Sequence, residues 1–234
     1  FALLFVLPLY LVNVLGLSVM GAGVILAAMA LGAFASGAMA RHIAGRLGSP
    51  GTVILGLSLE VVGVVALSII ATATIPGWAL TIPLAVYGLG LGLASAQLTG
   101  TILHDVPVEQ SGQGSATQST VRQVGSALGT AFSGTALSVI LAKTLPRALG
   151  RAGVPGEEIG KLAEATRVSA GSNLMALRQQ AGPEAEETLN ALTQGFSDGV
   201  RGSMLTSAAF LLIGLLGSLI VYRAAKKEAA KGIG

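Results

Sequence analysis

The sequence has no cysteine and little charge. Only 11% of its residues are Asp, Glu, Lys or Arg, whereas about a quarter are charged in soluble globular domains. The absence of cysteine excludes disulfides and thiolate metal sites, and the two histidines, His42 and His104, are too far apart for a metal-ligand motif. We therefore expect no metal and no cofactor, and the shortage of charge excludes an ordinary soluble domain.

The charge that is present falls in a few short stretches, and residues 2–40 carry none. Hydrophobic residues make up 52% of the chain, and the mean hydropathy is +0.76. About 20 consecutive apolar residues are enough for a helix to cross a bilayer. A membrane β-barrel would instead show short segments of alternating hydrophobicity. The long apolar runs therefore predict an all-α protein embedded in the lipid bilayer.

Turn signals divide the apolar sequence into six predicted transmembrane helices. Gly48-Ser49-Pro50 and Ile75-Pro76-Gly77 are typical of tight connections. The chain starts at Phe1 inside an apolar run without an initiator Met, so we expect its beginning to be missing and the first helix to be truncated. The predicted helices cover about residues 1–15, 18–40, 52–73, 78–103, 115–141 and 203–222.

Residues 143–199 differ from the rest because they are rich in charge, and we interpret them as a long loop outside the membrane. Pro183 and the three glutamates after it predict a helix start, because Pro suits the first turn and acids suit the positive end of the helix dipole. An apolar stripe at spacings of three and four then predicts a surface helix leading into the last span. This stripe consists of Leu189, Leu192, Phe196 and Val200.

These patterns predict four parts. Residues 1–144 hold the first five spans, 145–200 form an extra-cytoplasmic loop with amphipathic helices, 201–224 form the last span and 225–234 a basic tail. The basic residues of the 41–50 loop and of the tail then lie on one side, which the positive-inside rule makes cytoplasmic. The loop at 104–113, which would lie on the same side, is acidic rather than basic and so does not support this orientation. We expect a multi-pass protein of the inner (plasma) membrane with a cytoplasmic C-terminus and no affinity for nucleic acid.

Two groups of glycines and other small residues indicate close helix packing. Gly88, Gly90 and Gly92 superficially resemble a phosphate-binding loop, but that motif needs a preceding strand and access to water. In a membrane helix, such glycines let neighbouring helices approach closely. Gly125 and Gly129, with Ser and Thr around them, are expected to pack tightly against a neighbour, or against one that slides.

Three polar residues within predicted spans are candidate functional groups. Glu60 is an acid well inside an apolar span, where it is either a proton- or cation-binding group or a neutral or hydrogen-bonded structural acid. Arg122 either lines a cavity or extends to the interface with the membrane. Gln97 needs hydrogen-bond partners from another helix or from a wet cavity.

No catalytic constellation is present. The sequence contains no His-Glu-x-x-His, no serine nucleophile elbow, no Walker lysine and no pair of buried aspartates. We therefore expect that the protein is not an enzyme.

Several stretches resemble the C-terminal half of a major facilitator superfamily exporter of the fourteen-helix drug:proton antiporter branch. They follow one another in the order and spacing of that branch, and the resemblance spans essentially the whole chain. The stretches are Leu7–Leu11 through Gly16, Gly21–Gly23, Gly88–Gly92, Arg122–Gly129 and, after a long outer loop, Gly195–Arg201.

The resemblance implies roles for individual positions. The spans would be helices seven to twelve of the family's twelve-helix core, with the first and fourth lining a central cavity and the third and sixth outside it. Glu60, on the third, remains a proton-coupling candidate with the structural interpretation favoured. In the family's Gly-x-x-x-Asp-Arg-x-Gly loop, Arg46 and Gly48 are retained as conformational-loop candidates, but Gly45 replaces the acid. The substrate-cavity candidates are Asn13, Gln97, Thr101 and Arg122.

The function implied by this resemblance is proton-coupled export of amphipathic compounds by alternating access. Its partners would be the missing N-terminal half of the transporter, a small amphipathic substrate and protons. Two alternatives remain open: the membrane domain of an ATP-driven exporter, and a non-transporting membrane scaffold or sensor that uses residues 143–199 as its interaction surface.

Overall fold

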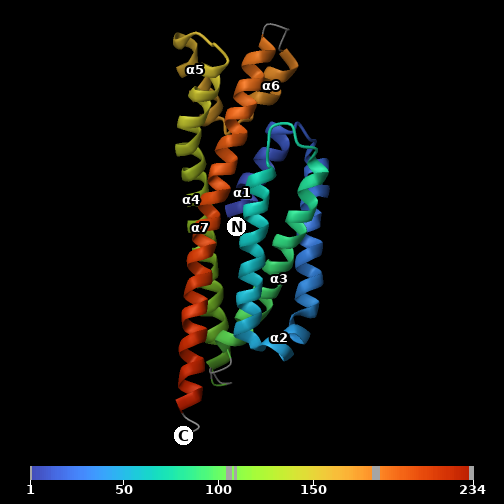
Figure 1. The fold of residues 1–234 in the computed structure, drawn as a ribbon, viewed down its shortest axis with the longest axis vertical. Helices are drawn as coiled ribbons and strands as arrows, with labels where there is room; N and C mark the ends of the chain where they lie inside the picture. Colours follow the sequence, from blue (N-terminus) through green and yellow to red (C-terminus); the bar gives the residue numbers. More distant parts are fainter. Residues whose placement is uncertain (1, 104–106, 108–109, 181–184, 232–234) are drawn as a thin grey trace. The chain divides into compact units, whose positions relative to one another are not determined.

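The computed structural model describes residues 2–103, 107, 110–180 and 185–231, and it contains no strand within these ranges. The all-α prediction is confirmed. The elements, shown in Figure 1, are α1 (Ala2–Leu9), the π-helix η1 (Tyr10–Val14), α2 (Val19–Ile70), the 3-10 helix η2 (Gly77–Leu80), α3 (Thr81–Leu103), α4 (Ser111–Arg151), α5 (Gly156–Val168), α6 (Asn173–Gln180) and α7 (Glu186–Lys231).

Within the described residues, four helical stretches are long and apolar enough to cross a membrane: Val19–Ile70, Gly77–Leu98, Ser111–Arg151 and Glu186–Arg223. Ala2–Val14 is a shorter apolar helix. Large hydrophobic side chains are exposed along these helices, including Val19, Phe34 and Ile213. Such surfaces are rare in soluble monomers and suit contact with lipid.

The predicted loop at residues 41–50 is largely helical, which corrects the sequence-based boundary. α2 continues through Arg41 and Arg46, whose side chains are exposed, and departs from helical geometry at Gly48. Gly48 has φ +73°, a conformation that residues with a side chain rarely adopt. α2 therefore consists of two helical arms, before and after Gly48.

The chain forms two compact units. Unit 1 comprises Phe1–Leu26, Val65–Thr81 and Ser126–Ser207. Unit 2 comprises Ala27–Val64, Ile82–Gly125 and Ala208–Gly234.

In unit 1, α4 and α7 pack closely along a row of α7 glycines. A methyl group at Gly195 would lie 3.1 Å from Leu145 Cα, and one at Gly202 would lie 3.1 Å from the Ile140 side chain, while Gly199 faces Leu141. This packing continues the α4–α7 contact past Leu141, the predicted end of the fifth span, and α4 ends ten residues later at Arg151. α7 begins at Glu186.

The apolar stripe predicted before the last span is confirmed. Leu189, Leu192, Phe196 and Val200 are all buried. They belong to α7, which continues without interruption into the last apolar stretch. Pro183, the predicted helix start, lies outside the described residues.

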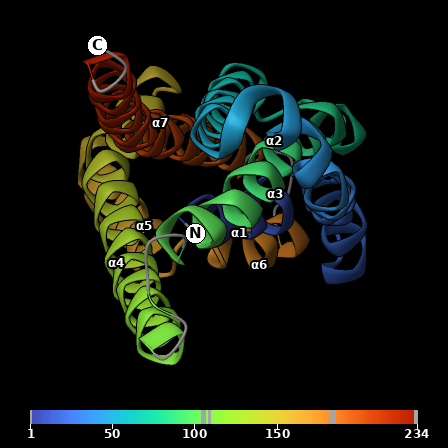
Figure 2. The ribbon, with the colours of Figure 1, turned by 90° about the horizontal axis from the view of Figure 1, so that it is seen from below.

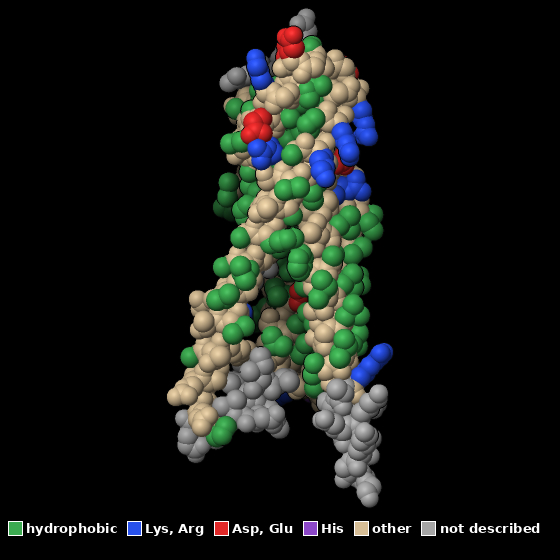
Figure 3. Space-filling view, turned by 90° about the vertical axis from the view of Figure 1, so that its left-hand side faces the viewer, with side chains coloured by type: hydrophobic (Ala, Val, Ile, Leu, Met, Phe, Trp, Pro, Cys, Tyr) green, Lys and Arg blue, Asp and Glu red, His purple; other side chains and the backbone are tan. Residues whose placement is uncertain are grey.

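The segment between α4 and α7, for which amphipathic helices were predicted, forms α5 and α6. Figure 2 shows α5 beside α4, where the Arg167 guanidinium donates a 2.8 Å hydrogen bond to Ser138 Oγ. On the face drawn in Figure 3, charged side chains gather at the end of unit 1 that carries α5 and α6. Arg167 also pairs with Glu164 at 2.6 Å, and this hydrogen bond holds the pKa of the exposed Glu164 carboxyl below its usual range.

In unit 2, α3 is packed against both arms of α2 through its glycines. A methyl group at Gly88 or Gly92 would overlap the Met29 or Ala33 carbonyl of the first arm. Gly90 faces the second arm, where an added methyl group would lie 2.6 Å from the Glu60 backbone nitrogen. The packing role predicted for these three glycines is confirmed.

For the second group of glycines, the prediction is not confirmed at Gly125 and Gly129. Within the described part of the chain, no heavy atom of a neighbouring element lies within 4 Å of a methyl group built at Gly125 or Gly129. Gly134, in the same stretch, makes only ordinary contact with Phe5 at 3.5 Å. Small residues permit close packing, but they do not by themselves supply the neighbour.

Candidate functional site

Glu60 lies at the centre of the contact between the second arm of α2 and α3, and it is 5% exposed. Gly56 and Gly63 are four residues before and three residues after it, so all three lie on one face of the helix. That face points at α3: a methyl group at Gly56 would lie 2.7 Å from the Ala94 nitrogen, and one at Gly63 would lie 2.7 Å from Tyr87 Cβ. Glu60 is therefore an acid placed between two glycine-mediated helix contacts.

The Glu60 carboxylate has no hydrogen-bond or ion-pair partner among the described residues. In the described ranges, Thr144 Oγ1 is the one side-chain polar atom that is fully enclosed and has no partner. The Glu60 oxygens also have no partner, but they are not fully enclosed. These oxygens therefore reach the surface through the small exposed part of the side chain. A carboxyl group with no cationic partner in an apolar helix is favoured in its neutral form.

Gln97 and Thr101 continue along α3 from this contact. Gln97 is seven residues after Gly90, about two helical turns, and so lies on the same side of α3. Its side chain is half-buried. Thr101 falls within α3, but its side chain lies outside the described residues. The structure thus places Glu60 and Gln97 along one α2–α3 seam in unit 2.

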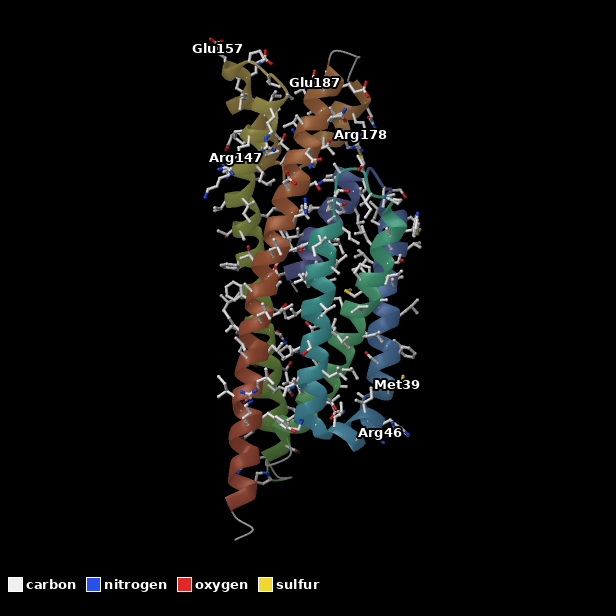
Figure 4. All side chains as sticks on the ribbon, viewed as in Figure 1. Met39, Arg46, Arg147, Glu157, Arg178 and Glu187 are labelled. Carbon is white, nitrogen blue, oxygen red and sulfur yellow. The ribbon has the colours of Figure 1, made fainter. Side chains whose placement is uncertain are left out.

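Arg122 lies on α4 in the part of that helix that belongs to unit 2, and its side chain is exposed. The break between the two arms of α2 is at Gly48, and Arg46, labelled in Figure 4, lies two residues before it. Thr52 Oγ1 donates a 2.9 Å hydrogen bond to the Gly48 carbonyl and so holds the start of the second arm to the break. Gly48 thus marks a break in α2, and Arg46 is exposed and has no ion-pair partner in the described ranges.

Asn13 belongs to unit 1, unlike the other candidates. It is 6% exposed, and its side-chain amide donates a 3.0 Å hydrogen bond to the Ala170 carbonyl, in the turn between α5 and α6. Arg178 of α6 donates a 3.0 Å hydrogen bond to the Val14 carbonyl at the end of η1 (Figure 4). The two bonds fasten the α5–α6 segment to the end of the first apolar helix.

Gly16 completes this attachment. Its φ of +66° favours glycine, and a side chain there would overlap the Arg178 guanidinium. Asn13, the polar residue identified in the first span, is thus hydrogen-bonded to a segment more than 150 residues away in the sequence. No local sequence pattern could indicate this contact.

We expect Arg178→Ala to loosen α6. Losing a hydrogen bond from a charged, partly exposed donor costs about 1 kcal/mol, so amides of α6 should exchange with deuterium roughly fivefold faster. Arg151→Ala is the matched control, because Arg151 is exposed and has no side-chain partner among the described residues. Equal exchange rates in the two variants would show that the Arg178–Val14 bond does not hold α6 in place.

A second polar cluster in unit 1 was not identified from the sequence. Arg201 Nε donates a 2.8 Å hydrogen bond to the Ser68 carbonyl, Ser197 Oγ donates one of 2.9 Å to Ala71, and Tyr10 Oη donates one of 2.6 Å to Thr72. Together these side chains occupy carbonyls at the C-terminal end of α2. The spacing of Gly195, Ser197, Gly199 and Arg201 was an available signal, since it alternates a glycine face with a polar face.

In the described part of the chain, no group of three or more His, Cys, Asp or Glu side chains is arranged to hold a metal ion.

Comparison with known proteins gives two matches. The family model of the Major Facilitator Superfamily matches residues 1–130. The riboflavin transporter RibZ of Clostridioides difficile (strain 630) is 31% identical over 131 residues, which are 56% of this chain and 28% of the relative. The chain thus matches little more than a quarter of that relative's length. No solved structure matches.

Proposed function

The chain belongs to the major facilitator superfamily, and from this premise we propose that it forms part of a proton-driven exporter of amphipathic compounds. The observation that carries the proposal is the family match over residues 1–130, which supports a multi-pass membrane transporter rather than an enzyme. The drug:proton antiporter branch is our finer assignment. It rests on the sequence resemblance that includes Gly195–Arg201, beyond the matched range.

We propose six membrane spans for this chain. They are α1 with η1, the two arms of α2, then α3, α4 and α7. The arms are counted separately because Gly48 interrupts α2 next to the basic residues Arg41 and Arg46. The positive-inside rule then places this break and the C-terminal tail in the cytoplasm, and α5 and α6 outside.

In this proposal the chain works with a second bundle of the same transporter, and the two rock around a midplane cavity, as in other transporters built from repeats. Asn13, Gln97, Thr101 and Arg122 are the proposed substrate-facing residues, and Arg46 and Gly48 the proposed conformational loop. Glu60 is the proposed proton-coupling residue. Protonation would shift the balance between inward-open and outward-open states.

The test is uptake of cationic dyes into inverted membrane vesicles containing the full-length gene product, because the inverted orientation turns export into uptake. We expect energised vesicles to accumulate dye and an uncoupler to abolish the accumulation, because the proton gradient supplies the driving force. Vesicles from cells that lack the protein are the control. Dye accumulation that needs ATP and survives the uncoupler would contradict proton coupling and favour an ATP-driven exporter.

Transport of a flavin is a second candidate, favoured by the 31% identity to a riboflavin transporter. The same vesicles distinguish it if labelled riboflavin replaces the dye. Saturable riboflavin movement that dyes do not inhibit would favour this candidate. If neither compound moves, the scaffold interpretation gains support, and the segment carrying α5 and α6 becomes the next target.

A further inference from the structure

Glu60 occupies an unusual position for an acid. Gly56, Glu60 and Gly63 form one face of the second arm of α2, and Gly90 of α3 lies directly against Glu60. A methyl group at Gly90 would come within 2.9 Å of Glu60 Cγ, so the absence of a side chain at Gly90 makes room for the acid. The two helices touch on both sides of the carboxyl group, and because Glu60 is only 5% exposed, water can reach its oxygens only through that small exposed part.

Among the described residues, no positively charged side chain lies opposite Glu60. α3 contains no Lys, Arg, His, Asp or Glu, and its single titratable side chain at the seam is Tyr87, which is 4% exposed. The first arm of α2 packs against Gly88 and Gly92 of α3. These two glycines lie on a different face of α3 from Gly90. The charged residues of unit 2 with described side chains are exposed: Arg41, Arg46, Arg122 and Arg223, with His42 also exposed.

The closed contact between α2 and α3 suits the neutral form of Glu60 better than its ionised form. The neutral acid fits the closed seam, since it needs at most a few polar contacts. The carboxylate needs a fuller shell of water or a cation, and the small exposed part of Glu60 does not provide that shell while Gly56, Gly63 and Gly90 hold the helices together. Loss of the proton therefore favours separation of α2 from α3 near Glu60.

We propose that Glu60 is a proton-binding site that controls the spacing of α2 and α3. The acid is protonated in the closed seam described above. It releases its proton to water when the helices part, and rebinding a proton lets them close. This proposal rests on the proposed proton-driven transport and deepens it, because it assigns the proton to one side chain and its effect to one helix pair.

The first experiment measures the proton itself. Infrared difference spectra of the purified full-length protein are recorded without substrate as the pH is raised from neutral to alkaline. We expect loss of the carbonyl stretch of a protonated carboxylic acid in the wild type and absence of that component in Glu60→Gln. Glu60→Asp should keep a titrating band, which separates the chemistry of the acid from a failure to fold. Glu164→Gln, which removes an exposed acid on α5, should match the wild type.

The second experiment measures the helix spacing. The chain has no native cysteine, so spin labels can be attached at Val62→Cys on α2 and Leu89→Cys on α3, two exposed positions of unit 2. We expect the distance between the labels to increase with pH in the Glu60 protein and to stay constant in Glu60→Gln. An acid band that titrates with unchanged amplitude in Glu60→Gln, or a distance that does not change with pH in the wild type, overturns the proposal. Neither readout requires transport, so a protein that exports no dye counts against the proposed exporter and not against this site.

Discussion

Gly88→Ala is expected to lower the free energy of unfolding by about 1–3 kcal/mol, although alanine is the better helix former. A methyl group at Gly88 would overlap the Met29 carbonyl oxygen. It would also lie 2.8 Å from the Met29 carbonyl carbon and 3.0 Å from Met29 Cα. These atoms belong to the backbone of a helix and cannot rotate away as a side chain can. The first arm of α2 would have to move away from α3, with loss of contacts at Gly32 and Gly92 as well.

The matched control for this substitution is Gly125→Ala. Gly125 is also a helical glycine of unit 2, but a methyl group there meets no described neighbour within 4 Å. Its replacement should be neutral or should stabilise the helix by about 0.5–1 kcal/mol, the usual gain of alanine over glycine. Thermal or denaturant unfolding of the purified full-length protein in detergent measures both. Equal stabilities of the two variants would contradict the close α2–α3 approach.

This pair of glycines shows what the sequence could and could not predict. In Gly88, Gly90 and Gly92 the helical spacing puts the first and third residues on one face and the second on another, and each face meets one arm of α2. Gly125 and Gly129 have an equally suitable spacing but no described neighbour. A sequence pattern predicts which surfaces can approach closely, while the partner depends on long-range packing.

The helix boundaries show the same division. Lys143 and Arg147 indicated a loop outside the membrane, yet α4 continues through both to Arg151. The buried Leu141, Leu145 and Leu149 continue its apolar face, and Leu141 and Leu145 pack against the glycines of α7. Charge marks where a helix leaves the apolar region, but it does not end the helix. Gly48, in contrast, was predicted as a break, and its positive φ explains why.

The candidate residues were found by their chemistry and not by their geometry. The sequence identified Glu60 as an acid whose burial in an apolar span costs free energy. Which helix its face of α2 meets could be settled only by the contacts of Gly56, Gly63 and Gly90 with the facing helix. Gly56 and Gly63, at four before and three after it, were a readable sign that this face meets another helix. Asn13 and Arg201 bind backbone carbonyls far away in sequence, and carbonyls have no sequence signature.

Every backbone carbonyl from Leu67 to Thr72 accepts a hydrogen bond, either from the side chains around Arg201 or from a backbone N–H group. Backbone N–H groups of Ala71 and Thr72 donate to Leu67 and Ile70, Arg201 donates to Ser68 and Ile69, and Ser197 and Tyr10 donate to Ala71 and Thr72. The carbonyls in the last turn of a helix have no intrahelical partner and carry its negative dipole end, so a guanidinium is well suited to them. Arg201 also pairs with Asp198 at 3.5 Å.

Arg201→Ala is therefore expected to destabilise the protein by about 1.5–3 kcal/mol, the range for hydrogen bonds to a charged group. It leaves the Ser68 and Ile69 carbonyls without their donor and frees the end of α2 from α7. Arg201→Lys should recover only part of the loss, because an ammonium is a point charge and cannot reproduce the two guanidinium bonds with the same geometry. Amide exchange near residues 65–72 should rise in parallel.

Arg147→Ala is the control for this prediction. Arg147 belongs to the same unit and points outward from α4 (Figure 4), and it has no side-chain partner among the described residues. Its removal should change stability by less than about 0.5 kcal/mol, as is usual for surface positions. If Arg201→Ala behaves like Arg147→Ala, the carbonyls at the end of α2 do not depend on Arg201. If Arg201→Ala is destabilised and Ser197→Ala is destabilised by less, then the guanidinium is the principal cap that joins α7 to α2.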